Sequence, residues 1–152
     1  MNALSRLLLL LAALSVAVVA PTAVDAAVSC HRIDASGVGQ DQGGGNTVAQ
    51  ISDGGLLQGT TAAAFTITGL SGTLASFVGI ITFTPNRATL AAEVAGTLDL
   101  STGAFSATTS SLSGTGKLEG ATGGLVFEGV ENLLTGTFTE VVIGQVCVDL
   151  AP

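Results

Sequence analysis

Residues 114–148 read GTGKLEGATGGLVFEGVENLLTGTFTEVVIGQVCV. The stretch opens with a glycine-rich segment, residues 114–123. It continues with two runs of β-forming residues, Leu125–Leu133 and Thr137–Leu150, which are separated by the turn signal Leu134–Gly136. Two such runs joined by a short glycine-containing link are typical of an antiparallel hairpin. We therefore take this hairpin as the unit from which the fold is built.

The rest of the chain shows the same pattern of short β-forming runs joined by Gly, Ser and Thr turns. The clearest run is Ala88–Leu100, whose alternate residues from Leu90 onward are Leu, Ala, Val, Gly, Leu and Leu. Such alternation indicates a strand with one buried face. Between the first two runs, the glycine-rich segment Ser36–Asn46 is expected to be a flexible loop. The predicted strands are Val28–Ile33, Thr47–Ser52, Leu56–Thr68, Ala75–Thr84, Ala88–Leu100, Ala104–Leu112, Leu125–Leu133 and Thr137–Leu150.

One hairpin pattern occurs twice. Gly96, Leu100, Gly103 and Phe105 recur, 33 residues later, as Gly129, Leu133, Gly136 and Phe138. Repeated hairpins favour a meander of sequential antiparallel strands. We predict an all-β fold, an antiparallel up-and-down β-barrel of about eight strands, because closure removes exposed strand edges. A β-sandwich is the alternative.

The segment GTGKLEGATG, residues 114–123, resembles the glycine-rich turn of the allene oxide cyclase and dirigent-type β-barrels. The resemblance implies a barrel, and it makes a cyclase- or isomerase-like activity an alternative function. None of the pocket residues of those enzymes has a recognisable counterpart in this chain, so we assign no catalytic residue.

The first 26 residues have the features of a signal peptide. Arg6 supplies a positive charge, Leu7–Ala20 is apolar, and Val24–Ala26 offers small residues at the cleavage positions. The apolar run is shorter than the roughly 20 residues of a membrane-spanning helix. We therefore expect one barrel domain, residues 27–152, that is exported to the periplasm or secreted, with no integral membrane span after processing.

The two cysteines fall in the first and last predicted strands. Cys30 and Cys147 are the only cysteines of the chain, and an even number in an exported protein favours a disulfide. A bridge between them would fasten the barrel where it closes. Lipidation of Cys30 is the alternative, although the leucine usual three residues before a lipidated cysteine is missing.

The composition argues against several function classes. The formal net charge of −7 repels nucleic acid, and the absence of Trp and Tyr disfavours stacking platforms and the aromatic girdles of outer-membrane barrels. His31 is the only histidine, which leaves little material for a metal site or a catalytic triad. The glycines at 114 and 116 match no nucleotide-binding motif. We expect neither a metal nor a cofactor.

Glu140 is the one candidate ligand-binding residue. It shares the parity of Phe138, Val142 and Val146 on the last strand. A carboxylate on an apolar barrel face can be a general acid or a ligand contact, but more often it lies at the solvated end of its strand, and we expect that position for Glu140. We expect an exported soluble barrel, a non-enzymatic binding or structural module that holds a small apolar ligand if its interior is hollow. A cavity with Glu140 inside would favour the enzyme.

Overall fold

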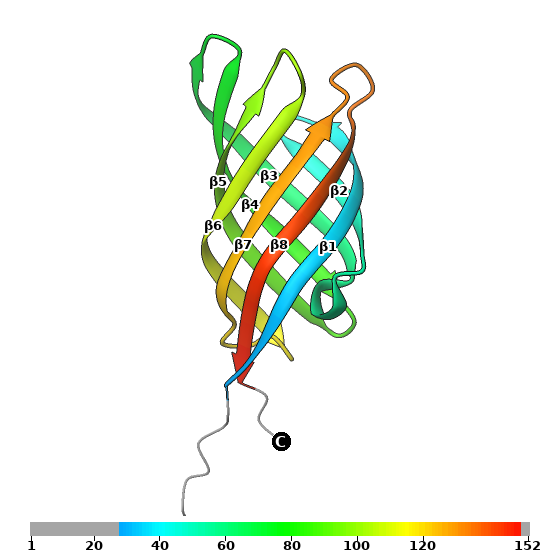
Figure 1. The fold of residues 1–152 in the computed structure, drawn as a ribbon, viewed down its shortest axis with the longest axis vertical. Helices are drawn as coiled ribbons and strands as arrows, with labels where there is room; N and C mark the ends of the chain where they lie inside the picture. The colour runs from blue at the N-terminus through cyan, green and yellow to red at the C-terminus, as the bar shows by residue number, and fades with distance from the viewer. Residues whose placement is uncertain (1–27, 150–152) are drawn as a thin grey trace, which may run out of the picture.

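The computed structural model describes residues 28–149, which form a closed up-and-down barrel. Each strand pairs antiparallel with the next, and the last pairs with the first (Figure 1). The barrel prediction is confirmed, and the sandwich alternative is wrong because no second sheet faces the first among these residues. The elements are β1 (Val28–Gly43), β2 (Asn46–Ser52), the 3-10 turn η1 (Gly55–Leu57), β3 (Gly59–Ser71), β4 (Leu74–Pro85), β5 (Ala88–Asp99), β6 (Ala104–Gly116), β7 (Thr122–Glu131) and β8 (Thr137–Asp149).

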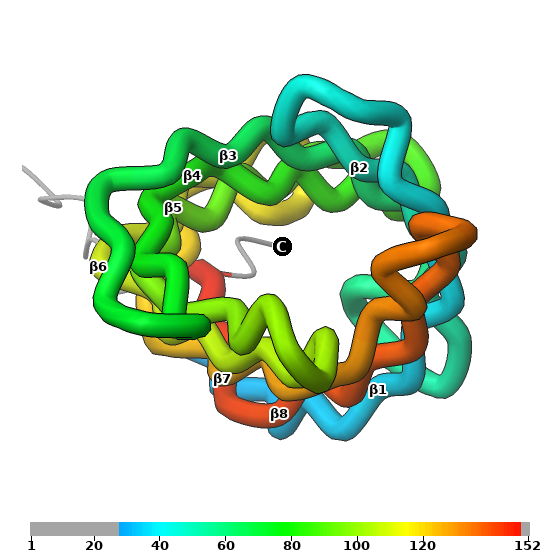
Figure 2. Tube along the Cα trace, turned by 90° about the horizontal axis from the view of Figure 1, so that it is seen from above, coloured from blue at the N-terminus to red at the C-terminus, as the bar shows by residue number. Residues whose placement is uncertain are grey.

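The two ends of the barrel differ. The upper end in Figure 1 carries the turns β1–β2, β3–β4, β5–β6 and β7–β8. The lower end carries η1, the turns β4–β5 and β6–β7, the start of β1 and the end of β8. Seen from above, the strands form a closed ring (Figure 2).

The prediction of a flexible loop at Ser36–Asn46 is wrong, because β1 continues as a strand to Gly43. Its backbone pairs on one side with β2, from Ser36 opposite Ser52, and on the other with β8, up to Gln40 opposite Thr137. Closure of the barrel gives this glycine-rich segment ladder partners on both edges. Those long-range hydrogen bonds outweigh its weak local preference for a strand.

The barrel closes along a long seam between β1 and β8. The register runs without interruption from Val28 opposite Asp149 to Gln40 opposite Thr137. Cys30 and Cys147 are direct register partners in this seam and form a disulfide, which confirms the predicted bridge. Disulfides persist in oxidising compartments, so the bridge indicates an oxidising environment. The predicted signal peptide lies outside the described residues.

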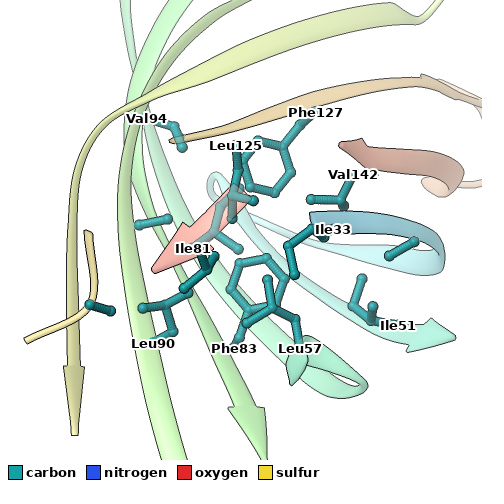
Figure 3. Packing of buried hydrophobic residues seen from close by; sticks show 14 of the residues in the cluster. Ile33, Ile51, Leu57, Ile81, Phe83, Leu90, Val94, Leu125, Phe127 and Val142 are labelled. Carbon is teal, nitrogen blue, oxygen red and sulfur yellow. The ribbon is translucent and has the colours of Figure 1, made fainter. Parts of the chain in front are cut away.

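The lower half of the barrel is solidly packed. Phe83 and Phe127 both belong to this core, with ring centroids 6.1 Å apart (Figure 3). Large side chains from most of the strands surround them and are almost completely buried. These side chains are Ile33, Ile51, Leu57, Leu90, Leu125, Val142, Val146 and Val148.

The segment 114–123 closes the lower end. Leu118 and Ala121 are buried in the core, and the β6–β7 ladder extends only between residues 104–108 and 126–130. Below that ladder the two strands diverge, and the turn folds back beneath the core. A Cβ on Gly114 would collide with the Leu118 backbone, so the close approach requires glycine there.

The repeated hairpins have the same turn. In the first, the Gly103 N–H donates to the Asp99 carbonyl at 2.7 Å. In the second, the Gly136 N–H donates to the Asn132 carbonyl, also at 2.7 Å. Both glycines have positive φ, 77° and 71°. The sequence repeat therefore corresponds to one turn structure used twice at the upper end.

Candidate functional site

The upper half of the barrel holds a cavity of about 280 Å³. Its wall is mostly aromatic and aliphatic, and its few polar groups come from β1, β2, β3, β7 and β8. The phenylalanines that line it are Phe65, Phe77, Phe105, Phe127 and Phe138. The polar side chains that line it are Asp41, Thr47, Thr61, Glu131 and Glu140.

The cavity exists because large and small residues are paired across neighbouring strands. Four phenylalanines each face a glycine on the next strand, and a Cβ on any of these glycines would collide with the opposing ring. Each ring therefore lies close over the backbone of its glycine, which leaves the axis of the upper half open. The pairs are Phe65–Gly79, Phe77–Gly96, Phe105–Gly129 and Phe138–Gly39.

Glu140 forms a fifth pair of this kind, with Gly37. A Cβ on Gly37 would lie 2.6 Å from Glu140 Cγ and 2.7 Å from its Oε1, so the carboxylate side chain lies over that glycine. Glu140 lines the cavity and is not at the solvated end of its strand. Burial raises the pKa of its carboxyl from the ordinary 4.5 to about 7.

Two more carboxylates line the cavity close to its mouth. The Asp41 N–H donates to the Gly136 carbonyl at 2.7 Å, and the Glu131 N–H donates to the Gly103 carbonyl at 2.9 Å. Each residue is therefore tied to the turn glycine of a repeated hairpin. Burial, and then the charge of Asp41, raise the pKa of Glu131. The two side chains thus lie near enough to repel each other.

Neither mouth residue was among the sequence candidates. For Glu131 the signal was present, because it shares the parity of Leu125 and Phe127 in its run. Asp41 lies in the segment expected to be a loop, where parity has no meaning. Only the continuation of β1 through Gly43 places Asp41 on the inner face.

Thr61 is the buried polar residue of the wall. Its side chain is 7% exposed and lines the cavity. It lies in one ladder row with Phe138, Gly39 and Ala49. Gly39 and Ala49 are small, so this row adds little side-chain bulk to the interior.

Other ionisable side chains lie away from the cavity. Glu93 accepts a hydrogen bond from the Ser111 hydroxyl at 2.9 Å on the outer surface. Asp99 caps the β5–β6 turn, where hydrogen bonds from Ser101 hold its pKa below the ordinary value. His31 contacts the Ser29 hydroxyl at 3.2 Å, and Arg87 lies in the β4–β5 turn with φ 60°.

Within residues 28–149, no three His, Cys, Asp or Glu side chains form a group that could hold a metal ion. The same residues contain no helix that is both long and apolar enough to cross a membrane. Comparison of the chain with models of protein families, with curated proteins and with solved structures gives no match. The site therefore has to be interpreted from its own chemistry.

Proposed function

We propose that this protein is an exported, non-enzymatic binding protein that holds one small apolar ligand in the upper half of its barrel. The observation that carries the proposal is the cavity of about 280 Å³, lined by five phenylalanines. Its volume lies near the lower end of the roughly 300–1,000 Å³ typical of small-molecule sites. The ligand is therefore small.

The contrast between the two halves supports binding over a purely structural role. In the lower half, inward positions carry large side chains such as Phe83, Leu90 and Val142, all fully buried. In the upper half, many inward positions carry glycine or alanine, among them Ala63 and Ala107, which line the cavity. An eight-stranded barrel is just wide enough for side chains to fill it or for one small ligand to replace them.

Two features support export. Residues 1–26 have the pattern of a signal peptide. The Cys30–Cys147 disulfide suits a periplasmic or secreted protein. Retention of residues 1–26 in protein recovered from its native cells, shown by intact mass, would overturn this part of the proposal.

Calorimetric titration with 1-octanol, a neutral apolar probe, tests the binding proposal. We expect saturable binding at one site by the wild type. Ala63→Phe should abolish it because Ala63 lines the cavity, whereas Ala62→Phe should not because Ala62 is exposed on the outer face of β3. Binding that survives Ala63→Phe would overturn the proposal, as would the absence of saturable binding by 1-octanol and by charged probes of the same chain length alike.

A cyclase- or isomerase-like activity is the second candidate, and the position of Glu140 inside the cavity favours it. A carboxyl with a pKa near neutrality is suited to move a proton to or from a bound molecule. The test is cyclisation of an allene oxide, followed by chiral chromatography. An excess of one enantiomer that Glu140→Gln abolishes would support this candidate, and a racemic product from the wild type would exclude it.

A further inference from the structure

The cavity contains negative side chains without a positive partner. Glu140, Glu131 and Asp41 line it, and no Lys, Arg or His does so among the described residues. One oxygen of Asp41 accepts the Gly43 N–H at 2.7 Å. Glu140 has no side-chain hydrogen bond to any other described residue. An ionised carboxylate in an apolar cavity is costly unless a cation pairs with it.

Two threonines line the cavity besides the carboxylates, Thr47 on β2 and Thr61 on β3. The Thr61 side chain is 7% exposed. A threonine hydroxyl can accept a hydrogen bond from an N–H group, so the cavity wall offers neutral acceptors as well as carboxylates.

The aromatic wall suits a cation as well as an apolar body. Phe65 and Phe77 meet edge to face with ring centroids 5.2 Å apart, and Phe105 and Phe138 do so at 6.0 Å. The faces of such rings attract organic cations. A metal ion is a poor fit, because the described residues hold no group of carboxylates arranged to bind one.

We infer that the ligand is a hydrophobic amine, whose ammonium group pairs with Glu140 and whose apolar body lies against the phenylalanines. The inference rests on the proposed binding function and names its ligand class. Asp41 and Glu131, near the mouth, attract the cation toward the cavity. The same three carboxylates repel a fatty acid, although its tail would fit equally well.

The test compares three probes of the same chain length, octylamine, 1-octanol and octanoate, by calorimetry at about pH 8, where octylamine is an ammonium ion. We expect octylamine to bind at least about tenfold more tightly than 1-octanol, as one charge pair predicts, and octanoate to bind more weakly than 1-octanol. This comparison needs no variant, so a folding defect cannot obscure it.

Two matched variants then test whether Glu140 is the carboxylate that pairs with the ammonium group. Glu140→Gln should reduce the preference for octylamine over 1-octanol to less than about threefold. Glu128→Gln, on the outer face of β7, should leave the preference unchanged. An unchanged preference in Glu140→Gln would overturn the inference.

The outcomes separate this inference from the proposal beneath it. If 1-octanol binds as tightly as octylamine, the amine inference fails while the binding function stands. If octanoate binds most tightly of the three, the amine inference likewise fails while the binding function stands. If none of the three probes binds, both fail.

Discussion

At the scale of single residues, the upper half of the barrel depends on glycines that make room for a neighbouring side chain. Gly39 accommodates the Phe138 ring, and Gly37 accommodates the Glu140 carboxylate. In four of these pairs the large residue is phenylalanine, and only in the fifth is it charged. Glu140 thus occupies a position that the barrel otherwise uses for an aromatic ring.

Glu140 should make stability depend on pH. Its pKa is about 7 in the folded barrel and near the ordinary 4.5 when unfolded, so the folded state binds the proton more tightly. Stability is therefore lost as pH rises from about 4.5 to about 7, at a cost of up to about 3 kcal/mol above that range. Asp41 on β1 and Glu131 on β7 are the other titratable groups that line the cavity. Both are kept in a Glu140→Gln variant, so a comparison of that variant with the wild type reports on Glu140.

Urea unfolding of the wild type and of Glu140→Gln measures this effect. We expect the variant to be more stable than the wild type by up to about 3 kcal/mol at about pH 8, with the difference vanishing at about pH 4. Glu128→Gln, on the outer surface, should stay within about 0.5 kcal/mol of the wild type at both pH values. A constant difference between wild type and Glu140→Gln across this range would contradict the prediction.

Gly39→Ala should destabilise the barrel because the new Cβ would overlap the Phe138 ring and approach the Val48 carbonyl to 2.6 Å. We expect a loss of about 1–3 kcal/mol in the free energy of unfolding, typical of overpacking. Gly69→Ala is the control, since nothing lies within 4 Å of its Cβ position. Equal effects of the two substitutions would show that Gly39 is not required for space.

At the scale of elements, the turn between β6 and β7 closes the lower end of the barrel, and the turns of the repeated hairpins lie at the upper end. Leu118 is 1% exposed although it lies in a turn. The segment 114–123, which led to the resemblance with cyclase barrels, thus has an evident structural use in this chain. Its glycines permit the chain to fold back beneath the core.

Leu118→Ala should cost about 2–5 kcal/mol, because it opens a void at the base of the packed half. Urea unfolding gives the value. Leu134→Ala in the β7–β8 turn is the matched control, as that side chain is 98% exposed and its loss should cost less than about 0.5 kcal/mol. A small effect of Leu118→Ala would mean that the turn does not stabilise the lower core.

At the scale of the whole molecule, closure joins the two ends of the described chain. The disulfide links residues 117 positions apart, so its loop includes almost the entire barrel. Loss of the bridge in the double variant Cys30→Ser, Cys147→Ser should lower the free energy of unfolding by about 2–5 kcal/mol, mainly because the unfolded chain gains freedom. Reductant should produce the same loss in the wild type and none in the variant. Equal stability of oxidised wild type and variant would contradict this.

The sequence by itself determined the class of fold, its strand count and its closing bridge. Alternation such as that in Ala88–Leu100, together with the repeated turn around Gly103 and Gly136, is local information that a strand carries wherever it lies. The even cysteine count, with Cys30 and Cys147 in the first and last strands, then indicated where the barrel is fastened. Parity also placed Glu140 on an apolar face.

Only the tertiary structure decided that β1 extends through Gly43 and that the upper half is hollow. Gly37 and Gly39 have little strand preference of their own, and they become strand residues because β2 and β8 supply hydrogen bonds on both sides. The cavity, and the meeting of Asp41, Thr61 and Glu140 within it, depend on register between strands far apart in sequence. Register is a property of strand pairs, so no single run of residues encodes it.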